Sequence, residues 1–195
     1  MPDAFNSELA GLVKVDFKAL DQWFEEQMQI IYHPKDPFHR VDVLPTDRSV
    51  RVELNGTVLA DTKTGGGVMS LWETGFPPRW YLPRTSVNWE RLTESSTHTG
   101  CPYKGEASYY NVNLADGTEV KDAVWWYKSP IKESNEILGM LCFYPEKVEY
   151  FIDGKKAGSN GVPLEEVADG VKENGLEDPT REVRVHDHEN RSCNC

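Results

Sequence analysis

The stretch ASYYNVNLADGTEVKDAVWWY, residues 107–127, decides the fold that we expect for this chain of 195 residues. It holds two runs, 107–114 and 119–127, rich in the aromatic and β-branched residues that suit a pleated sheet. Ala115-Asp116-Gly117 supplies a turn between them. Further strands are expected at 79–82, 138–144 and 147–152. Short strands with closely spaced turn signals predict a mainly β fold, a small antiparallel domain.

The residues before this stretch suggest a hairpin and, farther upstream, a helix. Val50, Val52 and Leu54 alternate with polar residues up to Asn55-Gly56, a strong hairpin signal. Farther upstream, apolar side chains recur at helical spacing. They predict an amphipathic N-terminal helix over 17–31, capped by Asp16 and ending before Pro34. The apolar positions are Phe17, Leu20, Phe24, Met28 and Ile31.

Three regions follow from these signals. Residues 1–47 form a helix-and-strap extension, 48–154 form the β domain, and 155–195 form an acidic, flexible tail. Within the tail, Leu164, Val167 and Val171 suggest one short helix. His186-Asp187-His188 and Cys193-Asn194-Cys195 contain metal-binding residue types, but their spacing does not match known zinc sites. We therefore predict no metal and no other cofactor.

Charge and composition limit the partners. The formal net charge of -11 argues against non-specific binding to nucleic acid and against docking on anionic lipid. No apolar run approaches the ~20 residues that span a bilayer, and the N-terminus lacks a signal-peptide pattern. Four cysteines, two of them at the extreme end, do not form a disulfide framework. We expect a cytoplasmic protein whose partner is a small molecule, with its oligomeric state open.

Four ordered blocks suggest a family. They are Glu73 with RWYLPR at 79–84, STHTGCPYKGEASY at 96–109, DAVWWY at 122–127, and FY at 143–144. Over roughly residues 48–154 the chain resembles domain-of-unknown-function family 427 (DUF427). The resemblance implies a β-tent-like domain, similar to methionine sulfoxide reductase B and the cereblon ligand-binding domain.

Two features associated with this resemblance do not carry over. The zinc-binding Cys-x-x-Cys pairs of the β-tent relatives have no counterpart in the body of this chain. The family is sometimes labelled nucleotidyltransferase-like, but no glycine-serine phosphate loop followed by paired aspartates is present. The sequence therefore supports the fold implied by the resemblance and leaves the reaction open.

The region from Trp72 to Tyr110 contains many aromatic residues, several cations and carboxylates, and one thiol. We expect Glu73 to transfer protons, Lys104 to hold or polarise a substrate, and Cys101 to be a candidate nucleophile. Arg79 and Arg84 offer planar forks for a carboxylate or phosphate. Aromatic walls would exclude water; they are Trp72, Tyr81, Tyr103, Tyr109, Trp125 and Tyr127.

Each candidate has a structural alternative. Glu73 could form a salt bridge to Arg79 or Lys104, and the arginines could pair with Glu73 and Glu90 at the surface. Cys101 could be an inert buried thiol, and the rings could fill the core. The segment His33–Asp42 reads as a proline-stiffened strap over the domain; alternatively it is a lid that supplies His39 or Arg40 to the pocket.

Two main functional hypotheses remain, with a third beside them. The first is a cofactor-independent enzyme, such as an isomerase, lyase or hydrolase, acting by acid–base chemistry on a compact anionic or carbonyl-containing metabolite. The second is a non-catalytic module that binds a small ligand in an aromatic cage. The third is a protein-interaction domain that acts through the acidic tail.

Overall fold

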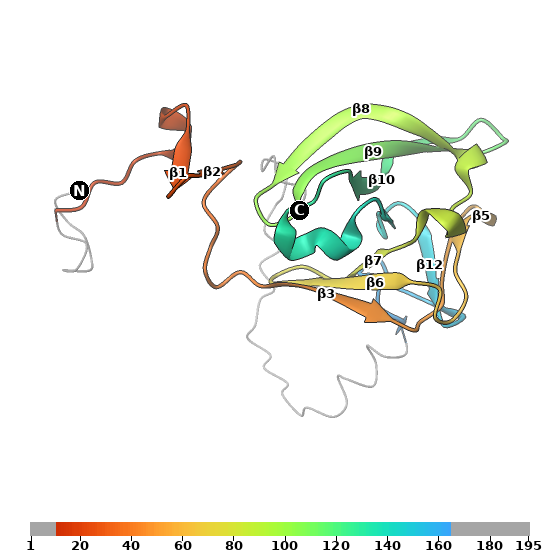
Figure 1. The fold of residues 1–195 in the computed structure, drawn as a ribbon. Coiled ribbons are helices and arrows are strands. Elements are labelled where there is room, and N and C mark those ends of the chain that lie inside the picture. The colour runs from red at the N-terminus through yellow and green to blue at the C-terminus, as the bar shows by residue number, and fades with distance from the viewer. Residues whose placement is uncertain (1–10, 165–195) are drawn as a thin grey trace, which may run out of the picture.

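Residues 11–164 are described by a computed structural model, in which the predicted mainly β, antiparallel fold is confirmed (Figure 1). The largest sheet has the order β11-β10-β9-β8, a second has the order β13-β12-β4-β5, and a third has the order β3-β6-β7. A separate hairpin, β1-β2, precedes them. The strands are β1 (Trp23–Glu25), β2 (Met28–Ile30), β3 (Val41–Thr46), β4 (Val50–Leu54), β5 (Thr57–Asp61), β6 (Val68–Glu73), β7 (Arg79–Tyr81), β8 (Leu92–Cys101), β9 (Gly105–Asn113), β10 (Glu119–Tyr127), β11 (Leu141–Phe143), β12 (Glu149–Ile152) and β13 (Lys155–Lys156).

Helical structure within the described residues is limited to short 3-10 turns. These are η2 (Phe17–Ala19), η3 (Arg84–Ser86), η4 (Trp89–Arg91) and η5 (Lys132–Ile137). Figure 1 shows η5 between the β8-β9-β10 layer and the β3-β6-β7 layer, close to the end of the β8–β9 connection. No helix within residues 11–164 has the length and apolar character needed to cross a membrane.

The turn predictions are confirmed. Asn55 and Gly56 have φ of 50° and 75° and join β4 to β5, as a primed hairpin turn requires. Gly117, at φ 88°, turns the chain between β9 and β10. Along β10, a bulge between Val120 and Val124 interrupts the register with β9. Beyond this bulge Trp125 faces Tyr109 and Trp126 faces Ser108, so the two tryptophans lie on opposite sides of the sheet.

Two apolar cores lie on the two sides of the same strands. Reciprocal main-chain hydrogen bonds between Leu82 and Leu141, at 2.8 and 2.9 Å, connect the β7 and β11 segments. The first core contains Trp80, Tyr110 and Val124 and extends to the β13-β12-β4-β5 sheet. Their immediate neighbours Tyr81, Tyr109 and Trp125 belong to the second core. Alternation along the strands therefore separates a closed core from a second one that lies beside η5 and β3.

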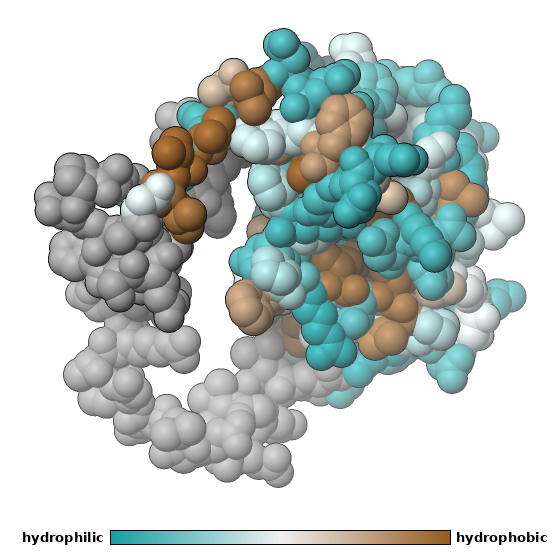
Figure 2. Space-filling model, turned by 60° about the vertical axis from the view of Figure 1, so that its left-hand side comes forward, coloured by the Kyte–Doolittle hydropathy of each residue, from teal (hydrophilic) through white to brown (hydrophobic). Residues whose placement is uncertain are grey.

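The predicted helix over 17–31 is wrong. Residues 17–19 form a single 3-10 turn, and β1 and β2 form a hairpin whose loop residue Glu26 has φ 52°. Asp16 does cap the turn, with its side chain accepting from the Lys18 N–H. The hairpin projects from the body in Figure 1, and Figure 2 shows apolar surface in this region. Leu20, Phe24 and Met28 are 53, 54 and 75% exposed, so the apolar stripe covers no core.

Smaller differences concern strand ends and the tail. Strand β11 is limited to 141–143, because η5 and the turn around Gly139 occupy the residues before it. The short turn expected near Asn88–Leu92 is present as η4. The tail helix through Val167 and Val171 and the two His/Cys clusters lie outside the described residues.

Candidate functional site

A buried ion pair forms the centre of the site. Lys104 Nζ donates to Glu73 Oε2 at 2.5 Å, and the two side chains are 3 and 2% exposed. Two charges so deep in a protein are stable only when they are paired and hydrogen-bonded. The structure therefore joins the two residues that the sequence predicted as proton carrier and cation, in the salt bridge that was their structural alternative.

The ends of two connections hold this pair in place. Glu73 is the last residue of β6, and Lys104 lies in the β8–β9 turn just before Gly105. Gly105 has φ 109°, a conformation that other residues rarely adopt. The segment before η5 supports the turn, because the Ile131 N–H donates to the Lys104 carbonyl at 3.0 Å.

His39 completes a triad with the pair. Its Nε2 lies 2.9 Å from Glu73 Oε1, and its side chain is 17% exposed. A carboxylate can only accept hydrogen bonds, so Nε2 carries the proton in this contact. In the neutral imidazole, Nδ1 then has a free lone pair. Among residues 11–164 no hydrogen bond to Nδ1 is found.

Strand pairing explains why His39 reaches Glu73. Strands β3 and β6 are antiparallel, and Val41 pairs directly with Glu73. The main chain continues this pairing beyond the strand, since the Thr74 N–H donates to the Arg40 carbonyl at 2.9 Å. His39 lies two residues before Val41, so a side chain of the strap is brought to the Glu73 carboxylate.

Tyr103 contacts the strap at two residues, His39 and Asp36. Its ring stacks on the His39 imidazole with centroids 4.1 Å apart, and its hydroxyl accepts from the Asp36 N–H at 2.6 Å. The Phe76 ring also meets the His39 imidazole edge-on, with ring centroids 6.5 Å apart. Lys35 Nζ and Glu133 Oε1 add an exposed ion pair at 3.1 Å. These contacts fix the imidazole plane, which orients its two nitrogens.

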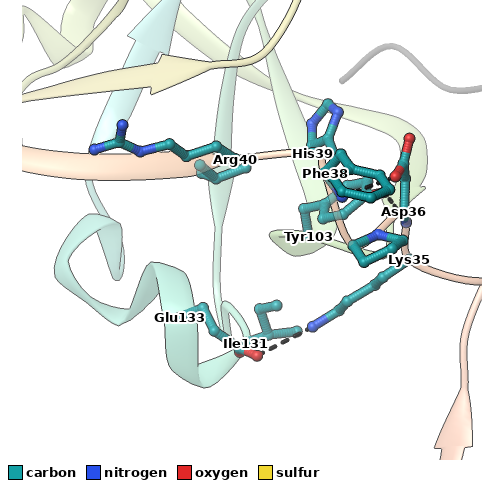
Figure 3. A pocket seen from close by; sticks show the side chains of 10 residues that line it. Lys35, Asp36, Phe38, His39, Arg40, Tyr103, Ile131 and Glu133 are labelled. Carbon is teal, nitrogen blue, oxygen red and sulfur yellow. Dashed lines mark hydrogen bonds and ion pairs between the residues drawn. The ribbon is translucent and has the colours of Figure 1, made fainter.

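A pocket of about 630 Å³ opens between the strap and the start of η5 (Figure 3). His39 and Tyr103 line it, whereas Glu73 and Lys104 lie behind them. Figure 3 shows Phe38 beside His39 at the top and Ile131 with Glu133 on the opposite wall. The remaining lining residues are Lys35, Asp36, Pro37, Arg40 and Val41. The pocket thus exposes one triad member to a ligand and shields the other two.

Four of the predicted aromatic residues fill the second core. Tyr81, Tyr109, Trp125 and Tyr127 are 1 to 7% exposed. Trp125 Nε1 donates to the Tyr81 hydroxyl at 2.9 Å, and the Tyr109 hydroxyl lies 2.7 Å from Thr99 Oγ1. Burial raises the pKa of Tyr81 well above its usual value, so this phenol stays protonated. These rings do not line the strap pocket, and they support the strands behind the triad.

Arg79 lies at the edge of the same core. It makes a two-pronged contact with Glu146, at 3.2 and 3.4 Å, and its guanidinium carbon is 5.6 Å from the Trp125 ring centre. Arg79 therefore pairs with Glu146 and not with Glu73, because the Glu73 carboxylate binds Lys104 and His39.

Three predicted residues lie away from the pocket lining. Arg84 stacks over Trp126, which packs against the first core, so it lies on the opposite side of the strands from the triad. Trp72 is 48% exposed and donates from Nε1 to Ser70 Oγ. Cys101 is 2% exposed at the end of β8, which limits access to its thiol.

Sequence reasoning named His39 only as a possible lid residue and did not connect it to Glu73. The missing step was the β3–β6 register, which brings His39 to Glu73 although the two residues are 34 positions apart in the sequence. The alternation of Val41 and Val43 marked the strand without identifying its partner. Ile131 and Glu133 carried no sequence signal of a pocket. No cluster of three or more metal-ligating side chains occurs within residues 11–164.

Comparison with known proteins identifies the family. Residues 42–154 match the model of a domain of unknown function, DUF427. Because the match covers more than half of the chain, this protein belongs to the DUF427 family, as the four sequence blocks indicated. No curated protein matches the chain. The matched region contains Glu73 and Lys104 and begins three residues after His39.

Proposed function

We propose that this member of the DUF427 family is a cofactor-independent enzyme that transfers protons to and from a small metabolite in the strap pocket. The observation that supports this most directly is the bridging Glu73 carboxylate, bound by His39 Nε2 on one oxygen and by Lys104 Nζ on the other. A base oriented by a buried carboxylate is a recurrent arrangement for proton transfer.

In this proposal each triad member has a separate role. His39 Nδ1 accepts the proton of the substrate, because Nε2 is already engaged with Glu73. Glu73 fixes the tautomer and stabilises the imidazolium that forms. Lys104 pairs with Glu73 and compensates the charge of the carboxylate in its buried position. Glu73 and Lys104 are thus positioning residues, and His39 is the catalytic residue.

The charges suggest a substrate with a carbonyl or carboxylate. Protonation of His39 leaves the triad with a net positive charge, which stabilises an enolate or a similar anion next to it. Lys35 and Arg40 line the pocket. They form ion pairs with Glu133 and Asp42, whose side chains are 63 and 32% exposed. Such exposed pairs contribute little, so a substrate anion can replace them at small cost.

Exchange in D2O tests the proposal without knowledge of the product. The full chain is incubated with a mixture of small keto acids, aldehydes and hydroxy acids, and each compound is followed by proton NMR and mass spectrometry. We expect one of them to exchange a carbon-bound proton for deuterium, or to be converted, at a rate at least about 100-fold above the His39→Gln variant. Arg51→Ala, which removes an exposed side chain of β4 outside the strap pocket, serves as the control.

Two results would argue against an enzyme. If a compound binds and is recovered without deuterium or chemical change, the protein is a ligand-binding module. If His39→Gln exchanges at the wild-type rate, the base is another group and the triad is structural. Glu73→Gln separates orientation from binding, since it should lower the exchange rate more than the affinity.

A further inference from the structure

A second group of functional side chains lies on the opposite side of the strands from the triad. Its centre is Arg84 in η3, whose guanidinium carbon is 4.3 Å from the Trp89 ring centre and 5.4 Å from that of Trp126. Tyr110 stacks beneath Trp126, with centroids 6.1 Å apart and planes at 23°. The same Tyr110 meets Trp89 edge-on at 5.6 Å. The guanidinium is therefore held on a layered aromatic platform.

The loop that carries Arg84 is fixed by its own hydrogen bonds. Trp89 Nε1 donates to the Arg84 carbonyl at 2.9 Å, and Ser86 Oγ donates to the Pro83 carbonyl at 2.8 Å. The Asn88 N–H donates to the Leu59 carbonyl at 2.8 Å, which attaches the loop to β5. Arg84 is thus oriented before any ligand arrives, and pre-organised donors lose less entropy on binding.

Arg84 differs from most arginines of the chain in its charge environment. Arg40, Arg48, Arg51 and Arg79 each lie within 2.5 to 3.7 Å of a carboxylate. Within residues 11–164, Arg84 makes neither an ion pair nor a side-chain hydrogen bond, although the chain has a net charge of -11. A guanidinium stacked on an indole still presents its N–H edge outward in the fork that fits a carboxylate or phosphate.

Further donors lie along the same face of the sheet. Trp126 on β10 pairs with Ser108 on β9, and Ser108 pairs with His98 on β8. Directly paired residues point to one side, and adjacent strands are about 4.8 Å apart, so His98 lies about 10 Å from Trp126 across the sheet. The Ser108 hydroxyl and His98 Nδ1 are 3.1 Å apart. A hydroxyl and an imidazole thus lie on the same face of the sheet as the Arg84 platform.

We infer that Arg84, on its platform of Trp89, Trp126 and Tyr110, forms a binding site for a compact oxyanion, a carboxylate or a phosphate, distinct from the strap pocket. Ser108 and His98 are further donors on the same face of the sheet. The aromatic faces around Arg84 are already in contact with the guanidinium and with one another. Recognition is therefore of the anionic group and not of a flat ring. This inference does not depend on the proposed proton transfer, because no triad residue is part of the site.

NMR of the full chain tests the inference. The indole N–H signals of Trp89 and Trp126 are followed while sodium phosphate or sodium acetate is added, with sodium chloride keeping the ionic strength constant. We expect a saturable shift of both signals with at least one anion. Arg84→Ala should weaken it at least about tenfold, and Arg84→Lys about three- to tenfold, since lysine lacks the two-pronged fork. Arg51→Ala, which removes an arginine from another sheet, is the matched control and should leave the shift unchanged.

The pattern of responses identifies the ligand class. Saturation with phosphate alone indicates a phosphoryl group, and saturation with acetate alone indicates a carboxylate. Ser108→Ala then measures how far the site extends along β9. A linear, non-saturating drift with both anions, or the same affinity in Arg84→Ala as in the wild type, would overturn the inference. Unchanged melting temperatures of the variants would exclude unfolding as the cause of a lost shift.

Discussion

Replacing Lys104 by methionine gives the sharpest test of the buried pair. The substitution keeps most of the side-chain volume and removes the ammonium that lies 2.5 Å from Glu73. Removing one partner of a buried pair leaves an uncompensated charge and typically costs about 3–5 kcal/mol. The two side chains are 3 and 2% exposed, so solvent does not replace the lost partner. Because His39 still donates to Glu73, we expect the lower half of that range, about 3–4 kcal/mol.

Urea unfolding of the full chain, followed by tryptophan fluorescence and circular dichroism, measures this change. The double variant Lys104→Met/Glu73→Gln removes both charges, and it should recover at least about half of the loss, since a neutral buried pair avoids the desolvation penalty. Lys35→Met is the matched control, because its ion pair with Glu133 is 43 and 63% exposed and is worth at most about 1 kcal/mol. If Lys104→Met lowers the free energy of unfolding no more than Lys35→Met does, the Lys104–Glu73 pair is not shielded from solvent and the argument fails.

Three other predictions concern the supporting structure. Gly105→Ala should destabilise the fold by about 2–3 kcal/mol in urea unfolding, because φ is 109° and an added Cβ would lie 3.2 Å from the Ser129 carbonyl oxygen. Gly117→Ala, with φ 88° and open space, should cost less, and equal losses would exclude the Ser129 contact as a cause. Tyr103→Phe should speed amide exchange at Asp36 by loss of its 2.6 Å acceptor, at a cost of about 1 kcal/mol; unchanged exchange would mean that the hydroxyl does not hold the strap. Burial raises the pKa of the Cys142 thiol, so peptide mapping after iodoacetamide treatment at neutral pH should find it modified only in urea, and rapid native labelling would contradict its burial.

Much of the β domain could be predicted because its signals are local. Asn55-Gly56 requires a tight turn with positive φ whatever the rest of the fold, and the β4–β5 hairpin follows from it. The alternation of Trp125 and Trp126 similarly depends only on strand geometry. The helix over 17–31 failed because periodicity predicts a helix only where a core receives its apolar stripe. Here Phe24 and Met28 remain more than half exposed.

The candidate site was predictable in its residue types and not in its pairing. Glu73 and Lys104 stood out as charges among rings, and their contact is one of the two salt bridges considered for Glu73. Which cation pairs with Glu73 depends on how the β8–β9 turn sits against the end of β6, a long-range arrangement that no local pattern encodes. Arg79 could equally have been the partner, and in the structure Glu146 binds it.

The limits of the family match divide the proposed triad. Residues 42–154 contain Arg84, Ser108 and His98, together with the Glu73–Lys104 pair, but His39 lies outside this region. The domain therefore supplies a buried, oriented carboxylate, and the preceding strap supplies the imidazole that faces the pocket. A carboxylate that is 2% exposed cannot reach a substrate directly. In our proposals, proton transfer in the strap pocket requires a docked strap, whereas anion binding at Arg84 depends on the domain alone. Mutation of Tyr103 should therefore separate the two proposed functions.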